Sequence, residues 1–204
     1  MRRGLWLAAF VVVAFAFGTP ATATPIIIDF STGTGGPGGT IVVTDGVVTG
    51  SGIFIDSLTV LGAPVTGVFD VNGTATGDAG PSGVLNFVYG GGANSISITG
   101  GIPALDIPNG TVLLSGTFAD FWWVNTNSVY GAGPDAKSEL LLRALGVPLD
   151  TQFKFFGFSI AMPDYPYTAY STDISNTSVP DAGSSLLLMG LGLAGLGVWR
   201  KRLG

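Results

Sequence analysis

The sequence predicts an all-β protein: a β-sandwich or jelly-roll-like domain with one short helix, flanked by an N-terminal signal peptide and a C-terminal transmembrane helix. Three observations lead to this prediction. Apolar and polar residues alternate with a period of two over much of residues 24–170, which is typical of half-buried strands. Glycine and proline separate these runs at intervals of roughly ten residues, as in sandwich folds. The two ends of the chain are instead continuous apolar stretches.

The N-terminal segment has the three parts of a secretory signal peptide. Two arginines follow the first residue, and Leu5–Phe17 is an apolar stretch. Ala21 and Ala23 are the small residues that signal peptidase accepts. We therefore expect residues 1–23 to direct the chain to the Sec translocon and to be removed after Ala23.

The strand signals begin directly after this segment. Asp45 and Gly46 separate two β-branched runs, which is the strongest short signal for a hairpin. A glycine turn divides residues 83–101 into two expected strands, and residues 110–124 contain one or two more. Further period-two alternation covers 52–62 and 65–77. These segments together predict the β domain.

One segment, residues 133–148, predicts a helix instead. Asp135 can cap its start, Leu141 and Leu145 share a face, and Gly146 suits the position after its last turn. Pro148 prevents the helix from continuing.

The last part of the domain returns to alternation. Phe153 and Phe155 are expected on one side of a strand, and Lys154, Phe156 and Phe158 on the other. Residues 171–178 are polar without apolar periodicity, and we expect them to form a linker rather than part of the domain.

The C-terminal segment combines a short motif, an apolar stretch and a basic end. Leu186–Trp199 covers only ~21 Å of a ~30 Å hydrocarbon core at about 1.5 Å per residue, and residues 183–185 extend it to about the lower limit for a span. Three basic residues follow and are expected to stay cytoplasmic: Arg200, Lys201 and Arg202. Both ends then place the domain outside the inner membrane.

The order of these three parts resembles the PEP-CTERM class of sorting signals, and most closely its subtype with a Val-Pro-Asp-Ser-Gly motif. The motif residues are Val179, Pro180, Asp181 and Gly183, and Ala182 stands where the subtype has serine. The resemblance covers residues 179–204. It implies that an exosortase recognises and cleaves the chain near the motif. It also implies a transient anchor in the inner membrane, followed by release to the cell surface or the extracellular polysaccharide.

Composition excludes several kinds of chemistry. The 204 residues include no cysteine and no histidine, so disulfides, thiolate catalysis and histidine-based catalysis or metal binding are impossible. Between residues 24 and 180 there are three basic and twelve acidic residues, a formal charge of −9. Nucleic acid is therefore not an expected partner, because its phosphates require lysine and arginine. We expect no cofactor and no metal.

The candidate ligand-binding residues are Asp120, Trp122 and Trp123, since a carboxylate beside aromatic rings can hydrogen-bond and stack on a sugar. The alternative is an ordinary strand with one inward and one outward face. A second set of rings has the same two interpretations, sugar contacts or a surface loop: Tyr165, Tyr167 and Tyr170. A third set supplies oxygens for Ca²⁺ but lacks EF-hand spacing, and equally suits a turn: Asp70, Asn72 and Asp78.

The sequence thus predicts an exported surface or matrix protein with a structural or adhesive role and no enzymatic activity. A carbohydrate-binding module of the extracellular polysaccharide matrix is the alternative. A hydrolase would need two facing carboxylates, and no such pair is evident in the sequence.

Overall fold

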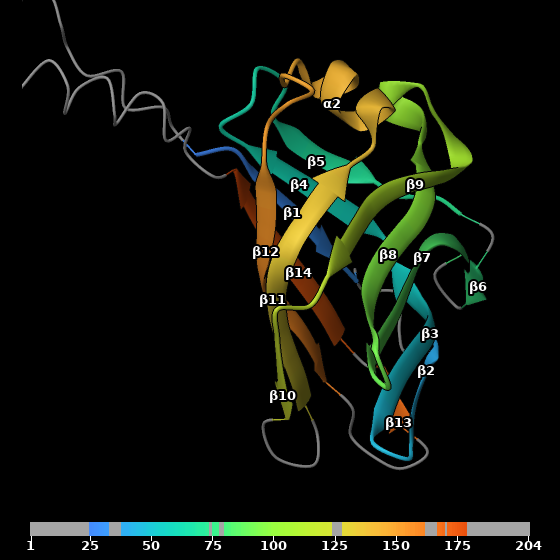
Figure 1. Cartoon of the computed structure of the whole chain (residues 1–204). Coiled ribbons are helices and arrows are strands. Elements are labelled where there is room, and N and C mark those ends of the chain that lie inside the picture. Colours follow the sequence, from blue (N-terminus) through green and yellow to red (C-terminus); the bar gives the residue numbers. More distant parts are fainter. Residues whose placement is uncertain are drawn as a thin grey trace, which may run out of the picture.

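The structure is a computed structural model, and it describes residues 25–32, 38–73, 75–77, 80–123, 128–161, 167–169 and 171–178 (Figure 1). The expected signal peptide and the expected C-terminal membrane helix lie outside these ranges. Within them, no helix has the length and apolar character needed to cross a membrane.

The described residues form fourteen strands in one antiparallel sheet. In chain order they are β1 (Ile27–Ser31), β2 (Thr40–Thr44), β3 (Val47–Ile55), β4 (Ser57–Leu61), β5 (Gly67–Asp70), β6 (Ala75–Gly77), β7 (Gly80–Gly90), β8 (Ala93–Ile102), β9 (Ile107–Thr117), β10 (Asp120–Trp123), β11 (Ser128–Lys137), β12 (Phe153–Ala161), β13 (Tyr167–Thr168) and β14 (Ser171–Ser178). Their order in the sheet is β13-β2-β3-β7-β8-β9-β11-β12-β14-β1-β4-β5, with β10 beside β11 and β6 beside β7. The all-β prediction is confirmed.

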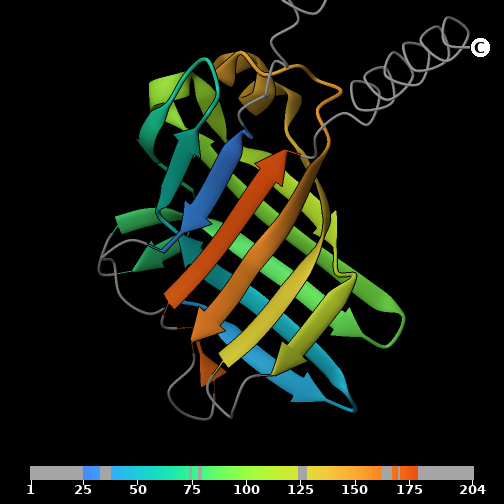
Figure 2. The same ribbon diagram turned by 90° about the vertical axis from the view of Figure 1, so that its left-hand side faces the viewer.

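The sheet folds over on itself, so that its two halves enclose the core. Figure 2 shows β1, β14, β12 and β11 in front of β7, β8 and β9. The rings of Phe87 on β7 and Phe158 on β12 lie 5.1 Å apart, although three strands separate β7 from β12 in the sheet order. The two layers expected of a sandwich are therefore halves of one continuous sheet. We call β10, β11, β12, β14, β1, β4 and β5 the front layer, and its solvent side the outer face.

Two hairpins form where the sequence predicts them. Asp45 and Gly46 both adopt positive φ, at 50° and 78°, and join β2 to β3. Two-residue turns of this kind match the twist of the flanking strands. The glycine turn after Gly90 joins β7 to β8 in the same way.

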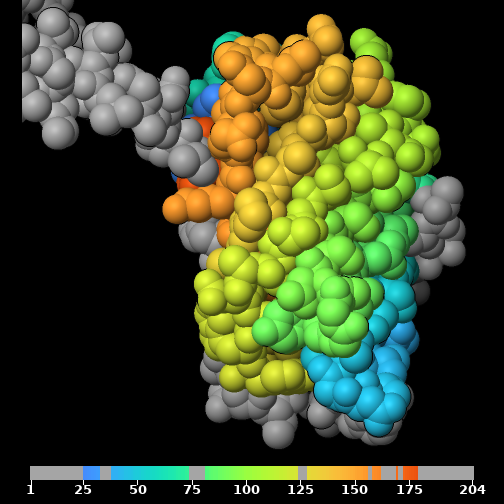
Figure 3. All heavy atoms as spheres, in the orientation of Figure 1, coloured from blue at the N-terminus to red at the C-terminus, as the bar shows by residue number. Residues whose placement is uncertain are grey.

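The helix is shorter than predicted and starts later. α2 spans Glu139–Leu145, and the Ser138 hydroxyl caps it by accepting a hydrogen bond from the Leu141 amide. The prediction of an Asp135 cap is wrong, because Asp135 pairs with Phe153 and Gly116 as part of β11. Gly146 ends the helix at φ 69°, as expected. In the space-filling view, this segment covers one end of the molecule (Figure 3).

The predicted alternation in β12 is interrupted by a bulge. Phe155 pairs with Asn176 and Ser159 with Asp173, so β12 has one residue more than β14 between these pairs. The extra residue changes which side chains face inward. Phe158 is consequently buried on the same side as Phe155, and its predicted place on the opposite side is wrong.

The predicted linker is a strand. Residues 171–178 form β14, which lies between β12 and β1 in the front layer. Thr172, Ile174 and Asn176 are buried, so the period-two pattern is present, but two of its three inward residues are polar. The domain therefore extends to Ser178.

Candidate functional site

The chain enters and leaves the sheet at the same end. The Ile26 amide donates to the Ser178 hydroxyl at 2.9 Å, and the Ser178 amide donates to the Ile26 carbonyl at 2.9 Å. The expected sorting residues begin at the next position and lie outside the described residues: Val179, Pro180, Asp181, Gly183, Arg200, Lys201 and Arg202. The expected cleavage residues Ala21 and Ala23 also lie outside. The segments before residue 25 and after residue 178 are thus attached to neighbouring strand ends.

The structure separates the three candidate ligand-binding residues. All three belong to β10, where neighbouring side chains point to opposite faces. Phe121 packs inward, with its ring stacked 4.4 Å from that of Tyr89. Asp120 and Trp122 therefore share the outer face, whereas Trp123 alternates to the other side with Phe121.

Trp122 forms an exposed aromatic platform with a residue that the sequence did not single out. Its ring lies 6.2 Å from that of Tyr130 on β11, and the two planes are only 14° apart. Trp122 remains 46% exposed. Two nearly parallel rings at a solvent face offer apolar surface of the kind that stacks on the apolar face of a sugar ring.

The strand register extends this platform into a line of side chains that crosses the front layer. Each member lies opposite the next on the neighbouring strand, and all point to the outer face. We call this line the cross-strand row: Trp122, Tyr130, Ser159, Asp173, Ser31, Ser57 and Asp70. At about 4.8 Å per strand, it is roughly 29 Å long.

Hydrogen bonds order the middle of the row. The Ser31 and Ser57 hydroxyls lie 2.8 Å apart. Asp29, two residues from Ser31 on β1, lies opposite Ser175 on β14 and shares a hydrogen bond with Asp173. The pKa of Asp29 is raised from 3.8 to about 6. Burial is the largest cause, followed by the hydrogen bond to Asp173 and the negative charge of Asp173, while a hydrogen bond from Ser175 lowers the pKa in part. The Asp29 carboxyl therefore keeps its proton in mildly acidic solution, where an ordinary aspartate has lost it.

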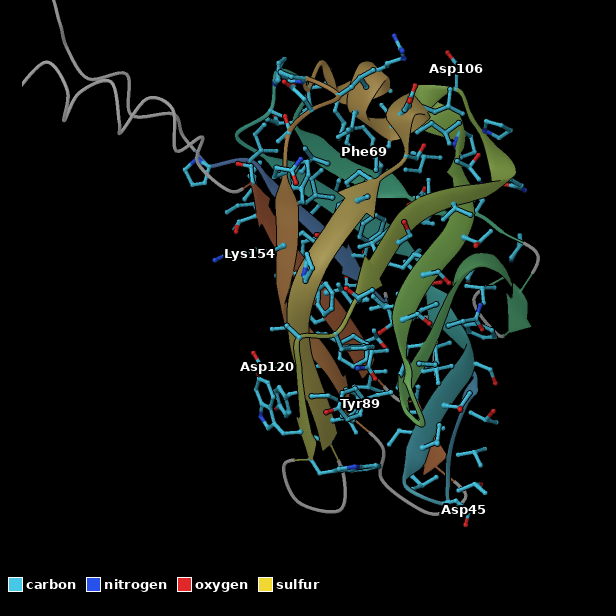
Figure 4. All side chains as sticks on the ribbon, in the orientation of Figure 1. Asp45, Phe69, Tyr89, Asp106, Asp120 and Lys154 are labelled. Carbon is cyan, nitrogen blue, oxygen red and sulfur yellow. The ribbon has the colours of Figure 1, made fainter. Side chains whose placement is uncertain are left out.

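A groove of about 570 Å³ lies beside the platform on the outer face. Its polar side chains are Asp120, Gln152 and Lys154, and the rest of its lining is mainly apolar. Figure 4 shows Asp120 and Lys154 projecting from the same side of the molecule, the side that faces the viewer in Figure 2. The outer face thus combines aromatic rings, carboxylates, hydroxyls and one amine.

The other candidate sets are not assembled into a site by the described residues. Asn72 forms a bridge with Gly101 through its backbone, and Asp78 lies outside the described ranges. No group of three or more acidic side chains suited to a metal occurs in the described part of the chain. Tyr167 belongs to the short strand β13, whereas Tyr165 and Tyr170 lie outside the ranges.

Sequence reasoning missed most of the cross-strand row. The serines and Asp173 are unremarkable in the sequence, and only the pairing of distant strands aligns them. Tyr130 had one usable signal, since it is an aromatic residue in an alternating segment. The bulge in β12 decides which of its residues faces Tyr130, and no local pattern predicts that register.

Comparison with known proteins informs only the C-terminal end of the chain. No curated protein and no solved structure matches it at a significant level. Among protein families, residues 178–203 match the VPDSG-CTERM motif. This match begins at the last residue of β14, so the motif follows the folded domain without a spacer. The chain therefore carries a VPDSG-CTERM motif, a sorting signal of the PEP-CTERM type that marks an exported protein for processing by an exosortase.

Proposed function

We propose that the protein is a non-enzymatic structural or adhesive component of the cell surface or extracellular matrix. The observation that carries this proposal is the sorting signal at residues 178–203, joined directly to a central strand of the domain. A compact β domain tied at one end leaves its outer face and its far end available for contacts. The expected route is the Sec translocon, signal peptidase and a transient anchor in the inner membrane.

Processing is tested by expressing the full chain in a Gram-negative host with and without an exosortase, then determining both termini by mass spectrometry. With the enzyme, we expect the chain at the surface or in the medium, cut near residue 180. Without it, we expect an uncut C-terminus in the inner membrane. Pro180→Ala should block cleavage, because proline holds the motif extended for the enzyme. Pro108→Ala, an exposed proline in the domain, is the matched control. Recovery of the intact chain from the cytosol of the exosortase host would contradict the proposal.

A carbohydrate-binding role in the extracellular polysaccharide is the second candidate. The stacked Trp122 and Tyr130 rings favour it, together with the carboxylates and hydroxyls that continue the cross-strand row. A polysaccharide chain is long and repetitive, and a row of roughly 29 Å across six strand spacings provides several successive contacts. Binding would require no metal and no cofactor.

Trp122→Ala tests this role, with Trp123→Ala as the matched control. Loss of a stacking ring is expected to weaken binding to the host's extracellular polysaccharide by about 2- to 10-fold. Trp123→Ala removes the same side chain from the neighbouring position on the opposite side, and should leave binding unchanged. Equal losses in both variants, or no binding by the wild type on a glycan array, would remove this candidate.

The acid pair of the outer face does not favour a glycosidase. Asp29 and Asp173 share a hydrogen bond. The carboxyl groups of glycosidases stand about 5–10 Å apart, with the substrate between them. The proposal accordingly assigns these two residues no catalytic role.

A further inference from the structure

A lysine is buried in the core of this protein. Lys137 is the last residue of β11, and its side chain has no exposure to solvent. The side chain of Asp135 is likewise inaccessible, and Asn176 is fully buried. Burying a charged pair has a large desolvation penalty, and an apolar pair of similar size is often as stable. The presence of three such groups together calls for a chemical explanation.

The three side chains converge from two strands that are not neighbours. Asp135 lies opposite Phe153 on β12, and Asn176 on β14 lies opposite Phe155 on β12. The side chain of Lys137 spans β12 from one flanking strand to the other, with Nζ 5.0 Å from the centre of the Phe153 ring. Nζ donates to Asn176 Oδ1 at 3.0 Å and forms an ion pair with Asp135 Oδ2.

The amide of Asn176 is held on both sides. Its Oδ1 accepts from Lys137, while its Nδ2 donates to the carbonyls of Ile28 and Ile174, each at 2.9 Å. The two carbonyls fix which end of the amide faces the lysine. Its carbon, Cγ, is bonded to the oxygen that Nζ contacts, so Nζ lies within roughly 4 Å of Cγ and needs only a small shift to reach the attacking distance of about 3–3.5 Å.

The surroundings favour an uncharged amine. Burial lowers the pKa of Lys137 well below 10.5. A desolvated, neutral lysine is a nucleophile, whereas an ammonium ion is not. Asp135 can take the proton that the amine gives up. Its second oxygen, Oδ1, is buried and has no hydrogen-bond partner among the described residues.

We propose that Lys137 and Asn176 join in an intramolecular isopeptide bond, and that Asp135 transfers the protons. The lone pair of Nζ attacks Cγ of Asn176, and Asp135 in its acid form transfers a proton to Nδ2. The Cγ–Nδ2 bond breaks, ammonia leaves, and the proton lost by Nζ returns to Asp135. One amide replaces another, so the reaction needs no oxidant and no cofactor.

The bond would link β11 covalently to β14, the strand that leads directly into the sorting signal. Force applied through the C-terminal end acts first on β14, whose hydrogen bonds to β12 and β1 would otherwise resist it alone. The chain has no cysteine, so a disulfide cannot serve this purpose. An isopeptide bond is also inert to reducing agents.

Intact-mass spectrometry of the purified, denatured full chain tests the proposal. We expect the wild type to be lighter than its sequence by the mass of one ammonia molecule. Lys137→Arg, Asn176→Ala and Asp135→Ala should each have the full mass. Lys154→Arg is the matched control, because it makes the same replacement on the outer face. Its mass should still be lower than its sequence by one ammonia molecule. Trypsin should fail to cut after Lys137 in the wild type, because an acylated lysine is not a substrate.

Another source of ammonia loss must be separated from this one. The Asn72-Gly73 and Asn109-Gly110 pairs can cyclise to succinimides, which also release ammonia. A succinimide is hydrolysed by mild alkali and still forms in Lys137→Arg. The isopeptide bond survives mild alkali and cannot form in Lys137→Arg. A wild-type chain of full mass, or an ammonia loss that survives Lys137→Arg, would overturn the proposal. The wild-type measurement does not depend on any variant folding.

Discussion

At the scale of single residues, the same amino acid serves different purposes that only its neighbours reveal. Gly46 provides a positive φ in a turn, which the sequence predicts from the Asp-Gly pair. Gly50 occupies an inward position of β3, where a Cβ would overlap the ring of Phe87. Phe87 is buried among the rings of Phe118 and Phe158 and has little room to move. The second glycine is therefore a packing requirement rather than a turn signal.

The Asp29 carboxyl predicts a dependence of stability on pH. Its folded-state pKa of about 6 exceeds the ordinary 3.8, so the folded state binds this proton more tightly than the unfolded state. This contribution to stability is present in acid and is lost as the pH rises from about 4 to about 6. Asp29→Asn removes the ionisation. We expect the free energy of unfolding of the variant to exceed that of the wild type by on the order of 1 kcal/mol at pH 7.5, and the two to be equal at about pH 3.5. The gain is modest because solvent screens a half-exposed group.

Thermal unfolding of both chains at the two pH values measures this difference. Asp173→Asn is the companion variant. Its stability at pH 7.5 should rise by less than that of Asp29→Asn. Burial is the largest cause of the raised pKa of Asp29, and that burial remains when Asp173 is neutralised. A gain of equal size at both pH values would show that Asp29 affects stability through packing rather than ionisation.

At the scale of elements, β14 is where the sequence misleads most. Its polar residues suggest a linker, yet hydrogen bonds to β1 and β12 place it inside the front layer. Asn176 occupies a core position where a strand normally presents an apolar residue. The side chain is tolerated there because Lys137 and two carbonyl groups satisfy its polar atoms.

Truncation separates the strand from the linker interpretation. A mature chain that ends at Tyr170 loses β14 and leaves two rows of unpaired backbone groups in the middle of the sheet, so we expect it not to fold. A chain that ends at Ser178 keeps every described strand and should fold. Circular dichroism and resistance to a protease measure both. Equal melting temperatures for the two chains would support the linker after all.

At the scale of the whole molecule, the position of the two ends matters most. Ile26 and Ser178 hold the ends of β1 and β14 together, so the C-terminal sorting signal and the segment that precedes β1 attach to the same end of the domain. In an antiparallel sheet this follows whenever the first and last strands are neighbours. The opposite end, with the β2–β3 turn at Asp45, is then the part of the domain farthest from the point of attachment (Figure 4).

The sequence by itself determined the strand class, the main hairpins and the C-terminal sorting signal, because period-two alternation, Asp-Gly turns and the VPDSG-type motif are local properties. Only the tertiary structure decided that residues 171–178 form a strand of the sheet, that β12 contains a bulge and which residues make up the cross-strand row. Each of these depends on register between strands that are distant in the chain. The meeting of Lys137 with Asn176 is the plainest case: hydrogen bonding across β12 brings together two residues that no local pattern connects.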